Sequence, residues 1–145
     1  MTMTKILYST RATATGGRDG TARTDDGTFE VALATPKELG GNGAGNNPEQ
    51  LFAAGYAACF LSAMKFVGTQ GKHVRLPADA SVSATVGIGP RADKGFGLTV
   101  TLDIALPGLN RDEAEALVAE ADTVCPYSHA VRGNIAVSLV IAQGA

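Results

Sequence analysis

Cys59 and Cys125 carry the most reactive side chains of this sequence, and three uses of such a pair fit it. Free cysteine packs like a small hydrophobic residue, so both thiols could be inert members of a core. As zinc ligands they would need two more donors, and the only histidines are His73 and His129. The third use is a thiol peroxidase pair, in which one thiolate is oxidised and the second thiol resolves it.

A zinc site fits the spacing poorly. No two cysteines are close together, and Pro126 breaks the helix that would align Cys125 with His129. We therefore predict no metal site. The residues alone leave the inert and the redox interpretation of the two thiols open.

The redox interpretation requires a cation near the reactive thiol. A thiolate, not a thiol, is the nucleophile. Cys59 lies three turns into the helix predicted over 47–70, beyond the first turn in which a helix N-terminus favours negative charge. Arg18 and Arg132 are candidates in glycine-bearing segments. Arginine stays charged, can hold a carboxylate by two bonds, and can still donate to a thiolate or to a peroxide oxygen.

The helix that carries Cys59 has clear start and stop signals. Asn47 can act as the N-cap, Pro48 suits the first helical position, and Gln50 can complete a capping box. Residues 51–67 are almost all apolar or small, and glycines follow at positions 68 and 71. The run is short and interrupted by polar residues, so it predicts a long central core helix rather than a membrane span.

The remaining elements predict an α+β fold with helices packed on a largely antiparallel sheet. Strands over 4–14 and 28–35 form a small N-terminal sheet (1–35) with Arg18 at a glycine-framed loop tip, and a glycine-rich linker over 36–46 follows. The linker lacks the glycine spacing of a nucleotide-binding loop. Over 80–142 the order is hairpin, helix and strand, with strands at 80–89, 96–106 and 135–142. The second helix has an Asn110–Glu113 capping box, an apolar face of Ala114, Leu117, Val118, Ala121 and Val124, and its end at Pro126.

The length, composition and charge of the chain limit the functions that it can have. The chain has 145 residues, 45% hydrophobic and 18% charged, which is enough for one globular domain over 1–145 without disulfide staples. Twelve basic and fourteen acidic residues give a formal charge of -2, which disfavours nucleic acid and anionic membrane as partners. The N-terminus shows no apolar signal core, so we predict a cytoplasmic protein that acts on a small molecule.

Three motifs resemble the organic hydroperoxide resistance proteins, within the wider osmotically inducible group of cysteine-based peroxidases. They are GGRDG at 16–20, ELGGNGAGNNPEQLFAAGYAACF at 38–60 and VCPYSHAVRGN at 124–134. The resemblance covers essentially the whole chain. It implies a single peroxidase domain, an intertwined homodimer, activity on organic and fatty-acid hydroperoxides, and recycling by dihydrolipoamide or a lipoylated protein without a bound cofactor.

The resemblance also implies roles for individual residues. Cys59 corresponds to the peroxidatic cysteine and Cys125 to the resolving one, and the two form an intramolecular disulfide after a Cys59 sulfenic acid. Arg18 corresponds to the arginine that activates the thiolate and binds peroxide, and Glu49 to the carboxylate that orients this arginine. The chain departs from the family pattern at His129 and Asp122. We expect these departures to leave the catalytic set intact and to bear on the pocket rim or on docking of the reductant.

Helix geometry adds a constraint. If the helix is continuous, Glu49 and Cys59 lie about 15 Å apart along its axis, too far to share one arginine directly. Either the first turn is unwound or a partner chain brings its own Glu49 and Arg18 to this Cys59. We favour the second alternative, because it explains why the site would require a dimer.

Aromatic residues around the thiols are the predicted substrate contacts. We expect the apolar tail of a hydroperoxide to lie on Tyr56, Phe60 or the second helix, with Tyr127 as a further candidate contact. Tyr127 and Arg132 either act on the substrate or only support the segment after Cys125, and we favour the structural role for both. The alternative function is a non-enzymatic dimer that senses oxidant through the same cysteines or binds a small apolar ligand. Such a protein would be oxidised stoichiometrically, without turnover under excess reductant.

Overall fold

The central helix α1 (Pro48–Gly68) begins directly after the predicted N-cap and ends at the first of the two predicted stop glycines, two residues before the predicted end at 70. The structure is a computed structural model that describes residues 3–142. Pro48 occupies the first helical position, where its missing N–H breaks no helical hydrogen bond. At the other end, a Cβ on Gly68 would lie 3.0 Å from the Leu76 nitrogen and from the Val74 oxygen. The returning chain can therefore pack directly on the end of α1 only because residue 68 is glycine.

The described chain divides into two compact units, 3–48 and 49–142, which are described separately. The first unit is a three-stranded antiparallel sheet in the order β1-β2-β3. Its strands are β1 (Ala12–Thr15), β2 (Thr21–Thr24) and β3 (Glu30–Ala32). The single domain predicted over 1–145 stays a prediction.

The strands of the first unit are shorter than the sequence predicts. The prediction of a strand over 4–14 is wrong for residues 4–11, and β3 covers only part of 28–35. The strand β2 was not predicted, because its four residues lie between two strong turn signals. Arg18 does lie at the predicted loop tip, in a short 3-10 helix (Gly17–Asp19) between β1 and β2.

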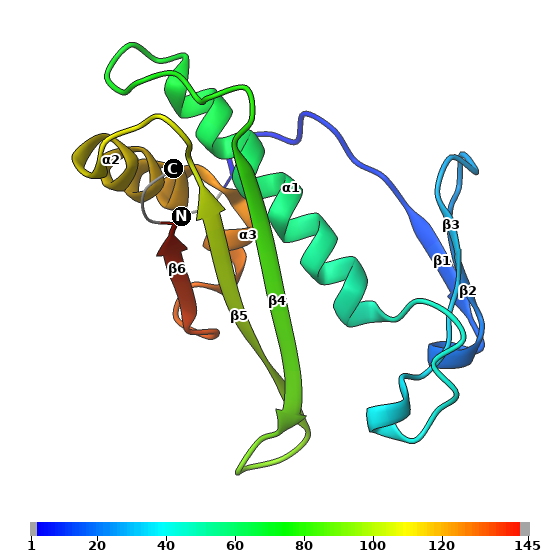
Figure 1. The fold of residues 1–145 in the computed structure, drawn as a ribbon. Coiled ribbons are helices and arrows are strands. Elements are labelled where there is room, and N and C mark those ends of the chain that lie inside the picture. The colour runs from blue at the N-terminus through cyan, green and yellow to red at the C-terminus, as the bar shows by residue number, and fades with distance from the viewer. Residues whose placement is uncertain (1–2, 143–145) are drawn as a thin grey trace. The chain divides into compact units, whose positions relative to one another are not determined.

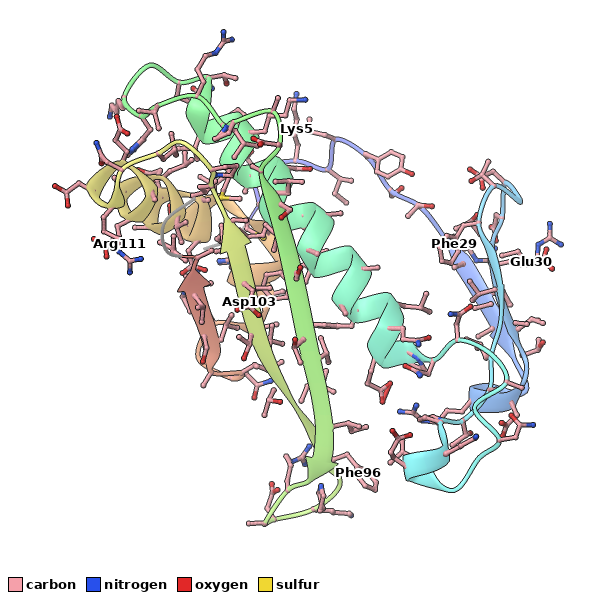
Figure 2. The ribbon with its side chains drawn as sticks, viewed as in Figure 1. Lys5, Phe29, Glu30, Phe96, Asp103 and Arg111 are labelled. Atoms are coloured by element: carbon pink, nitrogen blue, oxygen red, sulfur yellow. The ribbon has the colours of Figure 1, made fainter. Side chains whose placement is uncertain are left out.

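The second unit contains a three-stranded mixed sheet in the order β4-β5-β6. The hairpin of β4 (Ser81–Pro90) and β5 (Phe96–Ala105) is antiparallel, and β6 (Val137–Ile141) pairs with β5 in parallel. Because β6 pairs only with residues 100–104, the hairpin extends beyond it (Figure 1). Phe96 lies at this far end and is exposed (Figure 2).

Two helices follow the hairpin. The predicted Asn110–Glu113 capping box is present at the start of α2 (Arg111–Val124). Pro126 does end this helix, but it also begins a further short helix, α3 (Pro126–Val131), which the sequence analysis missed. Proline is favoured at a first helical position, so the residue that stops α2 also suits the start of α3.

One hydrophobic core joins the helices of the second unit to one face of its sheet. Along β5 the buried side chains alternate, and the opposite face of the sheet carries serine, threonine and Asp103 (Figure 2). The predicted apolar faces were too long, since Phe96 and Val124 are exposed. The fully buried members of the core include Tyr56, Phe60, Met64, Leu102, Ile104, Leu117 and Cys125.

The observed architecture confirms the predicted α+β class with helices on a sheet. By length and composition alone α1 could also cross a membrane. However, Tyr56, Phe60 and Met64 of this helix are fully buried in the protein core, as expected of the core helix that the sequence predicts. Such a core helix passes the same test of length and composition, so the test is weak evidence for a membrane span.

Leu102→Ala is expected to lower the free energy of unfolding by about 2–5 kcal/mol, because the side chain is fully buried in the middle strand of the sheet. Chemical denaturation measures the change. Val140→Ala is the matched control on the neighbouring strand β6, since Val140 is exposed. Equal effects of the two substitutions would contradict the placement of the core.

Candidate active site

The two cysteines meet between α1 and the junction of α2 with α3. The Cys125 thiol donates to the Cys59 sulfur, with 3.3 Å between the two Sγ atoms. Both are free thiols, Cys125 fully buried and Cys59 partly exposed. A disulfide requires about 2.05 Å between the sulfurs, so a small movement would allow a bond to form. The exposed sulfur is therefore the one that a reagent from solvent can reach first.

Local backbone structure places Cys125 at this junction. Its N–H donates to the Ala121 carbonyl at the end of α2, and its own carbonyl accepts from the His129 N–H of α3. Cys125 is thus both the C-cap of α2 and the N-cap of α3, and its backbone is extended (φ -63°, ψ 119°). This bend directs the thiol into the core beside α1.

Burial raises the pKa of the Cys59 thiol from 9.0 to about 11. The backbone N–H of Tyr127 acts in the opposite direction and lowers the pKa, whereas the neighbouring Cys125 raises it further. Within this chain Cys59 is therefore protonated at neutral pH. A peroxidatic role requires a positive group that reverses the effect of burial.

Three aromatic rings from α1 and α3 pack against one another. Ring centroids lie 6.1 Å apart for both Phe52–Tyr56 and Phe52–Tyr127, and 5.8 Å apart for Tyr56–Tyr127. A Cβ on Gly55 would come within 2.8 Å of the Tyr127 hydroxyl oxygen. Glycine at position 55 thus lets the Tyr127 ring lie directly on α1, next to the helical turn that carries Cys59.

The predicted substrate contacts differ in their exposure. Tyr56 and Phe60 are fully buried, whereas Tyr127 remains 40% exposed. The Tyr56 hydroxyl forms a buried hydrogen bond of 2.7 Å with the Ser128 hydroxyl, and burial raises the pKa of Tyr56. The role of the three residues as substrate contacts stays a prediction, and Tyr127 is the one that a ligand could touch in the chain as it stands.

An ion pair that the sequence analysis did not predict joins the two sides of Cys125. Nη2 of Arg132 donates to the Asp122 backbone carbonyl at 2.7 Å and to its carboxylate at 3.2 Å. This carbonyl lies in the last turn of α2, where carbonyls lack partners within the helix. The pair could not be predicted without knowledge of α3, because this helix brings Arg132 back to the end of α2.

The structure places the two remaining predicted site residues in different units. Arg18 lies in the first unit, in a turn where Gly16 and Gly17 adopt φ values of 76° and 60°. These conformations are unfavourable for residues with a Cβ. Glu49 belongs to the second unit, in the first turn of α1. Because α1 is helical from Pro48, ten residues of unbroken helix, about 15 Å, separate Glu49 from Cys59.

The histidines do not join the cysteines. His73 lies 3.8 Å from the Glu120 carboxylate on α2, and His129 is an exposed residue of α3. Among residues 3–142 no group of three or more histidine, cysteine or acidic side chains could hold a metal ion.

Comparison with known proteins places this site in a family. The OsmC-like protein family model matches residues 40–140. An organic hydroperoxide resistance protein of Xanthomonas axonopodis pv. citri is 54% identical over 139 residues, which cover 95% of this chain and 96% of that protein. Organic hydroperoxide resistance protein OhrA of Bacillus subtilis is 41% identical over 147 aligned positions, covering 97% of this chain and 100% of the relative.

Solved structures agree with these relatives. The crystal structure of an organic hydroperoxide resistance protein from Legionella pneumophila superposes with a TM-score of 0.90 at 51% identity, covering 95% of this chain and 99% of the other. The match extends over both units and includes the segments that carry both cysteines. The chain belongs to the OsmC-like family, among its organic hydroperoxide resistance proteins.

Proposed function

We propose that this protein is a thiol-dependent peroxidase that reduces organic and fatty-acid hydroperoxides to alcohols. The observation that carries the proposal is the 3.3 Å separation of a partly exposed and a fully buried thiol in a member of this family. If both cysteines were inert core residues, one of them would have no need to be more exposed to solvent than the other. A reaction that oxidises one sulfur from solvent and then closes a disulfide requires it.

The reaction starts at Cys59. Its thiolate attacks the terminal oxygen of the hydroperoxide, the O–O bond breaks, and the departing alkoxide takes up a proton to leave as an alcohol. Cys59 is then a sulfenic acid. The Cys125 sulfur attacks the Cys59 sulfur, and the hydroxyl group leaves with the Cys125 proton as water. A dihydrolipoyl dithiol reopens the disulfide by exchange and is itself oxidised to its cyclic disulfide.

Arg18 supplies the positive charge in this proposal, oriented by Glu49. Burial keeps Cys59 protonated, so activation must come from a charged group rather than from the helix around the thiol. The length of unbroken α1 between Glu49 and Cys59 supports a site completed by a partner chain. The protein would then be an intertwined homodimer, in which each Cys59 is activated by Arg18 and Glu49 of the other subunit.

Subunit mixing tests this arrangement. A Cys59→Ser chain and an Arg18→Gln chain are each expected to be inactive or nearly so. In a mixed dimer, a site completed across the interface combines an intact Cys59 with an intact Arg18, so activity is expected to return to about half of the wild-type value per dimer. A mixed dimer as inactive as its parents would mean that Arg18 acts within its own chain.

The substrate preference follows from the surroundings of the thiols. Tyr127 offers an exposed aromatic surface beside Cys59 and packs on the buried ring of Tyr56. An apolar tail gains from contact with such a surface, whereas hydrogen peroxide has no tail to place there. We propose that Tyr127 contacts the organic part of the substrate, that the reaction needs no bound cofactor, and that it takes place in the cytoplasm.

Steady-state turnover tests the proposed function. With excess dihydrolipoamide, the protein is expected to reduce many equivalents of tert-butyl hydroperoxide or of a fatty-acid hydroperoxide, with a higher kcat/KM than for hydrogen peroxide. Oxidation of one equivalent without further turnover would indicate a redox sensor instead.

A further inference from the structure

Two polar contacts fix the segment that carries Cys125. Arg132, directly after α3, bonds through a single nitrogen atom to both the carbonyl and the carboxylate of Asp122. Asp122 lies three positions before Cys125 and Arg132 lies seven positions after it, so the ion pair closes the segment between them into a loop. Arg132 and Asp122 are both partly exposed, and such a pair contributes little to global stability. Its effect is local, on the position of the loop.

The second contact joins the loop to the helix of the other thiol. Ser128 of α3 and Tyr56 of α1 share a buried hydrogen bond, and Tyr56 is one helical turn before Cys59. Burial makes this bond valuable, because a hydroxyl left without its partner would lose a hydrogen bond that water cannot replace. The bond therefore sets the distance between the two cysteine-bearing elements.

Cys125, Ser128 and Val131 of the loop are buried, but a pocket lies beside the loop. One pocket of about 260 Å³ lies at the end of α1, and another of about 150 Å³, which is open to solvent, is lined partly by residues of the loop. Tyr56, Asp122, Ser128 and Arg132 are among the residues that line this second pocket. On the side that faces this pocket, the two polar contacts help to hold the backbone of the loop.

We propose that Arg132 and Ser128 are positioning residues, which act through Asp122 and Tyr56 to hold the Cys125 thiol against Cys59. Their role is to make disulfide closure faster than a second oxidation of Cys59. The inference rests on the proposed peroxidase function. Displacement of about 1 Å can slow a reaction between two held groups by up to about 100-fold, so loss of these contacts is expected to affect closure strongly.

Two reactions compete for the Cys59 sulfenic acid. In the first, Cys125 forms the S–S bond and water leaves. In the second, another hydroperoxide transfers its terminal oxygen to the sulfur, which becomes a sulfinic acid, and an alcohol leaves. Only the first depends on the position of Cys125. The ratio of disulfide to sulfinic acid at a given hydroperoxide concentration therefore measures the positioning of the resolving thiol.

The test compares this ratio among variants of the full-length protein by intact mass, over a series of tert-butyl hydroperoxide concentrations. In Arg132→Gln, and in the double variant Tyr56→Phe with Ser128→Ala, we expect the ratio to fall by about tenfold or more. The double variant removes both hydroxyls, so that neither is left buried without a partner. In Arg132→Gln, which leaves the predicted substrate contacts unchanged, the rate of the first oxidation of Cys59 with one equivalent of hydroperoxide is expected to stay within about twofold of the wild-type rate.

Two controls separate positioning from general damage. Arg132→Lys is expected to restore most of the ratio, because one ammonium can donate to both Asp122 oxygens as the single Nη2 does. Glu115→Gln removes a different arginine pair, that of Arg111 at the exposed start of α2 (Figure 2), and is expected to leave the ratio unchanged. If Arg132→Gln does not fold, Asp122→Asn replaces it as a milder change to the same contact.

The outcomes are distinct. An unchanged ratio in folded Arg132→Gln or Asp122→Asn and in the double variant would overturn the inference and leave the peroxidase function intact. Failure of wild-type Cys59 to react with one equivalent of hydroperoxide would instead overturn the proposed function. A fall in the ratio that Arg132→Lys does not reverse would also contradict positioning through the Asp122 contacts.

Discussion

Cys59→Ser is expected to abolish hydroperoxide turnover, with a loss of at least about a thousandfold, because a serine hydroxyl is not ionised at neutral pH. The fold should persist, since the change of one sulfur to oxygen at a partly exposed position leaves the core intact. Reductant consumption with a dihydrolipoyl dithiol measures the activity. Substantial turnover in this variant would show that another residue reduces the peroxide.

Cys125→Ser is the matched control for that experiment. It keeps the exposed thiol but removes the buried one, so the first equivalent of hydroperoxide should still oxidise Cys59. Recycling through a disulfide should stop, and the sulfenic acid should proceed to sulfinic acid. Equal behaviour of the two serine variants would contradict the assignment of separate roles to the two sulfurs.

Arg18→Gln is expected to shift the reactivity of Cys59 to high pH. Without an activating cation, burial sets the pKa of this thiol to about 11. At pH 7 only about one molecule in 10,000 would then carry a thiolate. A thiolate of higher pKa is intrinsically more nucleophilic, which offsets about half of this loss on a logarithmic scale. Relative to a thiol that titrates near neutrality, the net loss in peroxide reduction is about 100-fold.

The pH dependence of Cys59 alkylation measures this effect directly. A raised pKa means that the thiolate appears only at higher pH, so the alkylation rate of Arg18→Gln should keep rising up to about pH 11. The wild-type rate should level off at a much lower pH. Arg23→Gln on β2 removes another arginine of the same unit and should behave like wild type. Identical profiles for wild type and Arg18→Gln would exclude Arg18 as the activating group.

The sequence predicts the elements with strong end signals and misses those without them. The start of α1 follows from Asn47 and Pro48, and the capping box of α2 follows from Asn110 and Glu113, because cap preferences act through local hydrogen bonds. The strand β2 has only four residues, too few for alternation to be distinguished from a turn. The helix α3 was missed because a proline that ends one helix can equally begin another.

The candidate site is predictable only in part. Residue types and spacing left inert core thiols and a redox pair as alternatives, and the family resemblance supplied the choice. The 3.3 Å separation of the sulfurs depends on how α2 and α3 pack against α1, which no local pattern encodes. The same holds for the Arg132–Asp122 pair, whose partners meet only because of the bend at Cys125.

The most direct test of the central claim is the intact mass of the reduced protein before and after one equivalent of an organic hydroperoxide, and again after dihydrolipoamide. The account predicts the loss of two hydrogens within one chain, reversal by the dithiol, and no such change in Cys59→Ser. No change in mass, or a slow gain of oxygen without a disulfide, would mean that the two thiols do not act together. The cysteines would then be core residues or parts of a binding protein.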